Sequence, residues 1–139
     1  MKTVHQDNDK FVLRFDKDEE VIAGIIAFMQ AQSIKACSFF GIGAAAEIKL
    51  GYYNPFLKSY RDKPYVDELE IISLNGIGAV KDGQPTLHTH GQFGRNDFSV
   101  LGGHVFSVKV SVVCEVFLTK MEGEMKRETN ADFNLDFLV

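Results

Sequence analysis

The sequence predicts an α+β fold, with one main helix near the N-terminus and a largely antiparallel β-sheet formed by the rest of the chain. Apolar residues recur at clear helical spacing in one segment, 21–29, whereas most other segments alternate apolar and polar residues or are rich in β-branched and aromatic types. The chain has 139 residues, 45% of them hydrophobic and 24% charged, which is typical of one globular domain. We therefore expect a single domain over 1–139, with residues 1–9 forming a polar N-terminal arm.

The first strand and the helix follow this arm. Phe11 to Phe15 alternates like a strand, and the next four residues, 16–19, resemble a capping box with acidic residues ahead of a helix. The helix is expected from Val21 to between Ala31 and Ser33, with a broad apolar face packed in the core.

Two strands are expected after the helix, at 35–40 and 47–53, joined at Gly41-Ile42-Gly43. These glycines are not followed by the Lys-Ser/Thr of a phosphate-binding loop, and the third glycine of a dinucleotide fingerprint is missing. A tight connection between strands explains them better. Asn54-Pro55 marks a turn, and 56–61 is expected to return as the second strand of a hairpin.

A further break is expected at 62–64, before a long strand over 66–76. Strict alternation divides this strand between two faces. One face carries Leu69 and Ile71, and the other carries Glu70, Ile72 and Leu74.

The remaining chain is predicted to be hairpin-linked strands. Lys81-Asp82-Gly83 is a hairpin signal. The strand candidates are 77–80, 85–93, 98–104, 109–119 and, in the tail from Met125, a polar strand followed by an apolar end at 133–139. The helix and the last strand should cover the sheet, and oligomerisation would protect its edges.

Charge and composition exclude several classes of protein. The net charge is −4, without a Lys/Arg run or an Arg-Gly-Arg-Pro hook, which argues against DNA binding by this chain alone. Cys37 and Cys114 lie in apolar runs and are expected to be buried thiols. No signal-peptide segment or membrane-spanning run is visible, so we expect a cytoplasmic protein that does not enter the membrane.

Three of the four histidines fall in one short window. His88 and His90 alternate on a strand, so both should point the same way, about 7 Å apart at Cα. His104 follows Gly102-Gly103, which permits close approach of its strand to the first. Three imidazoles would form an open zinc-type site, with a fourth position for water or substrate. The alternative is a set of surface histidines on adjacent strands, and His5 in the polar arm is not included.

Three more residues are candidates for a fourth ligand or a supporting role. Glu115 lies inside an apolar strand, where it would either contact the metal or place an inward-pointing charge at a sheet edge. Arg95 follows the histidine strand and could hold an anionic ligand. Glu70 shares a predicted face with aliphatic residues and is a similar candidate.

Several of these motifs, in this order, resemble the plants-and-prokaryotes-conserved (PPC) domain family from about Phe11 to the C-terminus. The matching segments are Gly41-Ile-Gly43, Leu50-Gly-Tyr-Tyr53, Glu70-Ile-Ile-Ser-Leu-Asn-Gly76, Asp82-Gly83, His88-Thr-His90, Gly102-Gly-His104 and Glu115-Val116. The resemblance implies an α+β homotrimer in which His88, His90 and His104 hold a divalent metal, most simply zinc. Prokaryotic members are commonly described as predicted DNA-binding proteins, and plant members also associate with partner proteins.

The histidine pattern is also similar to that of acetolactate decarboxylase, which has a related fold and a three-histidine zinc centre. We therefore expect a metal-binding homotrimer associated with DNA or transcription. The alternative is a small zinc-dependent enzyme, a lyase or hydrolase. A third possibility is a sheet scaffold whose histidines only tune assembly.

Overall fold

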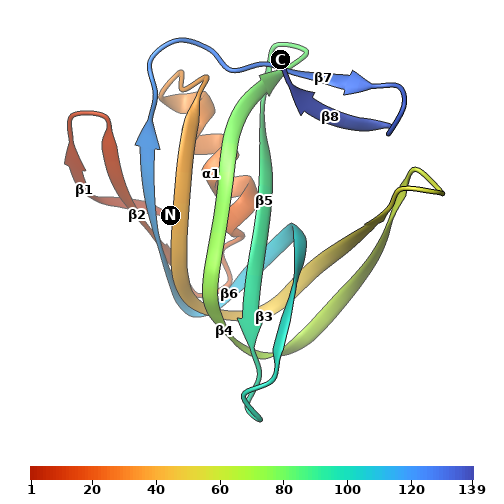
Figure 1. Cartoon of the computed structure of the whole chain (residues 1–139). Helices are drawn as coiled ribbons and strands as arrows, with labels where there is room; N and C mark the ends of the chain where they lie inside the picture. Colours follow the sequence, from red (N-terminus) through yellow and green to blue (C-terminus); the bar gives the residue numbers. More distant parts are fainter.

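Strands make up most of the computed structural model, which describes residues 1–139 (Figure 1). The elements, in chain order, are β1 (Lys2–Asp7), β2 (Lys10–Asp16), α1 (Val21–Ala31), β3 (Cys37–Asn54), β4 (Ser59–Lys81), β5 (Gln84–Gly94), β6 (Val100–Lys120), β7 (Arg127–Asn130) and β8 (Leu135–Leu138). This confirms the predicted α+β class with one main helix. No helix has the length and apolar character needed to cross a membrane.

The main sheet has six strands in the order β1-β2-β6-β3-β4-β5, and all its pairings are antiparallel. An additional pairing joins β5 to the first residues of β6, so that β3, β4, β5 and β6 close on one another. This closure is possible because β6 is long: residues 113–119 pair with β2, whereas 100–104 pair with β5. The start of β6 and the last five residues of β5, 90–94, therefore lie side by side.

The helix α1 begins one residue after Glu20, whose side chain accepts hydrogen bonds from the backbone N–H groups of Ile22 and Ala23. The predicted capping box is therefore displaced. Glu19 does reach back to the backbone N–H of Asp16, at 2.7 Å, but this contact closes the turn before the helix. The same Glu20 carboxylate accepts from Val108 N–H at 2.8 Å, which ties the start of α1 to β6.

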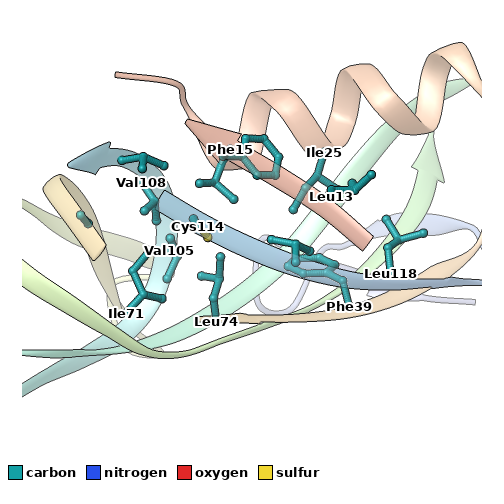
Figure 2. Close-up of a cluster of buried hydrophobic side chains, with 14 of the residues drawn as sticks. Leu13, Phe15, Ile25, Phe39, Ile71, Leu74, Val105, Val108, Cys114 and Leu118 are labelled. Carbon is teal, nitrogen blue, oxygen red and sulfur yellow. The ribbon is translucent and has the colours of Figure 1, made fainter. Parts of the chain in front are cut away.

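The core lies between α1 and the concave side of the sheet (Figure 2). Phe15 and Leu13 of β2, Ile25 of α1 and Leu118 of β6 contribute side chains that are at most 1% exposed. Both cysteines are buried free thiols, as predicted. Burial raises the pKa of Cys37 to about 11 and that of Cys114 to about 12, so neither is a thiolate at neutral pH.

The glycine connection predicted at 41–43 does not end a strand. β3 runs through it, with a register shift between Gly41 and Gly43. Gly43 has φ +154°, and a Cβ there would meet the Val113 carbonyl oxygen at 2.3 Å. The residue is glycine because β6 packs directly against its backbone.

In two further places β4 differs from the predicted strands, and each difference has a local cause. Pro64 lies within β4, in the part whose only strand neighbour is β3, and such an edge position tolerates a missing N–H. Later in β4 the pairing with β5 shifts between Ile71 and Ser73. This bulge restores Leu74 to the buried face with Leu69 and Ile71, while Glu70 and Ile72 stay exposed. The strict alternation that placed Leu74 with Glu70 was wrong for this reason.

Both ends of the chain differ from the expected arrangement. Residues 2–7 form β1, which pairs with β2, although every residue of β1 is exposed. The C-terminal strands β7 and β8 pair only with each other and form a separate hairpin. Figure 1 shows this hairpin beside the end of the sheet, not across it. The last strand therefore does not cover the sheet. The expectation that it would do so was wrong.

Candidate metal centre

The histidine pair lies on β5, with one buried residue between its members. Thr89 is 1% exposed, whereas His88 and His90 are exposed on the opposite side of the strand. Alternation along the strand therefore brings both imidazoles to one face, as predicted. Their Nε2 atoms are 3.2 Å apart.

The third histidine, His104, comes from the start of β6 and is half-buried. It is the direct Cα partner of His90 in the antiparallel pairing, and Gly103 pairs with Gly91. A Cβ on Gly103 would meet the carbonyl oxygen of Gly51 at 2.9 Å. The glycine thus lets β6 approach β3 and β5 together, which places His104 beside the pair.

The three imidazoles form a donor set that fits one metal ion. One ring nitrogen from each histidine lies within 4.8 Å of the others. Two nitrogens bound at about 2.0–2.1 Å to a tetrahedral zinc are about 3.3 Å apart, close to the 3.2 Å between His88 and His90. Nδ1 of His104 is buried and has no hydrogen-bond partner in the protein. A bound ligand would supply the missing partner.

Burial favours the neutral form of His88 and His104. Burial first, and then the neighbouring His88 and His90, lower the pKa of His104 to about 4. Burial and then the nearby Arg127 lower the pKa of His88. Neutral imidazole is the form that binds a metal, so the lowered pKa values of His88 and His104 favour coordination at neutral pH.

The cluster opens on one side into a small cavity of about 220 Å³. Tyr60 of β4 packs over His104, with ring centroids 4.9 Å apart, and lines this cavity. The C-terminal hairpin supplies the opposite wall through Arg127 and Asp136. The cavity is therefore lined by elements that are far apart in the sequence.

The other candidate residues lie outside the cluster. Glu115 is exposed on β6, where it pairs with Arg14 of β2 and Ile42 of β3, so it is neither buried nor grouped with the histidines. Glu70 and Arg95 line a different hollow, of about 860 Å³. Arg95 contacts Asp67 there at 3.7 Å.

Sequence reasoning missed the residues that enclose the cavity, namely Tyr60, Arg127 and Asp136. Arg127 lies in a polar stretch and resembles a solvated surface residue in the sequence, yet it is only 7% exposed. No local pattern gives its position, because the hairpin that carries it docks through tertiary contacts. Lys81 of β4 contacts Asp136 of β8 at 2.7 Å, and the Tyr53 hydroxyl donates to the Phe133 carbonyl.

Comparison with known proteins gives a consistent assignment. A family model of the Plants and Prokaryotes Conserved domain (PCC, the PPC domain above) matches residues 2–122. No curated protein matches the chain. A candidate DNA-binding protein from Bacteroides thetaiotaomicron is 29% identical with a TM-score of 0.94, over 97% of this chain and 94% of its own. A metal-containing protein from Archaeoglobus fulgidus is 33% identical with a TM-score of 0.89, over 100% of this chain and 99% of its own.

Acetolactate decarboxylase from Bacillus subtilis is a more distant structural neighbour. It is 13% identical with a TM-score of 0.52, and the alignment covers 88% of this chain but 57% of the enzyme. At this identity the likeness concerns the fold alone. The family match, in contrast, includes all three histidines and most of the chain. The chain belongs to the Plants and Prokaryotes Conserved domain family.

Proposed function

We propose that this protein binds one divalent metal ion per chain, zinc in the first instance, through His88, His90 and His104. The observation that carries the proposal is the convergence of three ring nitrogens within 4.8 Å of one another. The metal-containing relative from Archaeoglobus fulgidus supports it. An all-imidazole donor set favours zinc and similar transition metals over calcium or magnesium, which prefer oxygen ligands.

Metal analysis tests this proposal directly. The purified protein, stripped with chelator and reloaded with zinc, should retain about one equivalent per chain after gel filtration, as measured by mass spectrometry. Cobalt substitution should give the visible absorption of a four-coordinate site. A reloaded protein that emerges free of metal would contradict the proposal.

We also propose that the protein assembles as a homotrimer. The family resemblance suggests it, and an exposed apolar face of the sheet supports self-association. Phe40 of β3 and Phe117 of β6 stack at 5.0 Å on that face and are 54% and 48% exposed. Light scattering should give three times the chain mass of 15.6 kDa, and a monomeric mass would exclude the trimer.

Contact with DNA or with a protein partner is the wider role proposed for this metal-binding protein. Its support is the relative from Bacteroides thetaiotaomicron, whereas the net charge of −4 opposes strong phosphate binding. Any DNA affinity should therefore be measurable only at low salt and fall steeply as salt is added. Fluorescence anisotropy with an A·T-rich and a G·C-rich duplex tests this, and no binding to either would remove DNA from the proposal.

A small zinc-dependent enzyme, a lyase or hydrolase, is the second candidate function. It is supported by the opening of the three-histidine cluster into a cavity of about 220 Å³. Three protein ligands leave a metal position for water or substrate, where a metal supplies Lewis acidity. A zinc-loaded crystal structure tests this candidate, because a protein side chain in the fourth position would exclude it.

A further inference from the structure

Arg127 is a buried cation beside the histidine cluster. It is 7% exposed and lines the same cavity as His88 and His104. It also lies near enough to His88 to lower the pKa of that ring. A guanidinium stays charged at every relevant pH, so this wall of the cavity carries a fixed positive charge.

The protein neutralises this charge only in part, because Arg127 and Lys81 share the single carboxylate of Asp136. One terminal nitrogen of Arg127 donates to the backbone carbonyl of Asp136 at 2.8 Å, and Nε has no hydrogen-bond partner. Burial lowers the pKa of Arg127 and the nearby carboxylate of Asp136 opposes that shift, but the hydrogen bonds of this carboxylate go to other residues. It accepts from Lys81 Nζ at 2.7 Å and from Thr129 Oγ1 at 2.8 Å.

Buried charges in proteins are normally paired, because an unpaired one loses its hydration without compensation. Lys81 and Arg127 are two cations that share one carboxylate, that of Asp136, so positive charge is left in excess and the Arg127 Nε–H has no acceptor. Neutral histidines cannot supply the missing anion. The unmatched group therefore indicates an anionic ligand that comes from solution.

The size of the cavity limits what this anion can be. Pockets for drug-sized ligands are about 300–1,000 Å³, whereas this one is about 220 Å³. Its lining also includes the apolar side chains of Leu87, Leu135 and Phe137. This volume favours a small ligand over a nucleotide, and a carboxylate on a short carbon skeleton suits both the volume and the mixed lining.

We propose that the cavity between the histidine cluster and the C-terminal hairpin binds a small organic carboxylate, with Arg127 as the residue that holds its carboxylate group. This inference rests on the proposed function, since the ligand's second oxygen would face the metal held by the three histidines. A guanidinium can donate two parallel hydrogen bonds to a carboxylate, and Nε–H of Arg127 has no acceptor within the protein.

Glycolate, a two-carbon hydroxy acid, is the probe, and its uncharged analogue glycolamide is the ligand control. Both are titrated by calorimetry into zinc-loaded wild type, Arg127→Gln and Lys126→Gln, after the zinc content of each is measured. Lys126 precedes Arg127, does not line the cavity, and has a side chain that is 64% exposed. It controls for loss of one positive charge.

Wild type and Lys126→Gln should bind glycolate with similar Kd values, and Arg127→Gln should bind at least tenfold more weakly with unchanged zinc content. Glycolamide should bind wild type at least tenfold more weakly than glycolate. Equal Kd values for wild type and Arg127→Gln, or no glycolate binding by wild type, would overturn the inference. If wild type holds no zinc, the proposed metal site fails separately, and the same titrations of metal-free protein still test Arg127.

A second measurement covers the case in which Arg127→Gln does not fold. Arg127→Lys keeps the charge and removes the Nε–H group, so its spectrum identifies the Arg127 Nε–H resonance by absence. Glycolate added to wild type should shift that resonance. A resonance that does not move at saturating glycolate would overturn the inference without any need for the glutamine variant.

Discussion

His90 of β5 and His104 of β6 are direct cross-strand partners, and their ring centroids are 5.4 Å apart. Two rigid strands therefore set the spacing of the cluster, and His88 joins it two residues earlier on β5. Sites built on strands hold their geometry better than sites built on loops. The predictions below follow from this arrangement and from the contacts that support it.

Replacing His90 by alanine removes one of three proposed ligands and exposes no core residue. Zinc content should fall at least tenfold, because two imidazoles alone hold zinc much more weakly than three. Mass spectrometry of the reloaded protein measures this. His5→Ala is the matched control, since His5 is exposed on β1 and is not part of the cluster, and it should retain full zinc. Equal zinc in His90→Ala and wild type would contradict the assignment.

Acid should destabilise the metal-free protein before it reaches the range of the carboxylates. The pKa of His104 is about 4 in the fold against 6.5 for an ordinary histidine, so the unfolded chain binds more protons between these values. Stability is therefore complete above pH 6.5 and falls as the pH drops toward 4.

Urea unfolding of metal-free protein at pH 7, 6 and 5 measures this loss. His104→Asn lacks the titrating ring and should show a smaller change in unfolding free energy over the same range. A variant with the same pH dependence as wild type would refute the role of His104.

Glu20 supports the start of α1 and the middle of β6 at once. Glu20→Ala removes the helix cap and leaves Val108 N–H, now bonded at 2.8 Å, without its acceptor. We expect a loss of about 1–3 kcal/mol in unfolding free energy. Chemical denaturation of Glu20→Ala and of Glu122→Ala, a control in the exposed turn after β6, distinguishes this from a general charge effect. Similar small losses in both would show that the cap matters little.

Asp136 anchors the C-terminal hairpin to the sheet through Lys81, at 2.7 Å. Asp136→Ala should loosen β7 and β8 while the core keeps its stability, because the hairpin pairs with no strand of the main sheet. Amide hydrogen exchange should accelerate in residues 127–138 and stay unchanged in β6. Glu128→Ala, on the exposed side of β7, is the control. Uniform exchange changes across the chain would argue against a separately anchored hairpin.

Local patterns predicted much of the fold because they have local causes. The helix from Val21 to Ala31 follows from its apolar spacing, and the turn at Asp82-Gly83 follows from two residues that accept positive φ values, +50° and +77°. The long strands were interrupted in the prediction at Gly41–Gly43 and at Pro64. Those residues do not break strands here, because β6 packs against Gly43 and β5 does not reach Pro64.

Local patterns in the sequence specify the α+β class, the helix and the shared face of His88 and His90, since alternation and helical periodicity act over a few residues. Three placements follow from the folded structure alone: His104 is the cross-strand partner of His90, Glu115 lies exposed away from the cluster, and Arg127 lines its cavity. These placements depend on register, bulges and the docking of the C-terminal hairpin. They are set by contacts between residues far apart in the chain, which no local pattern encodes.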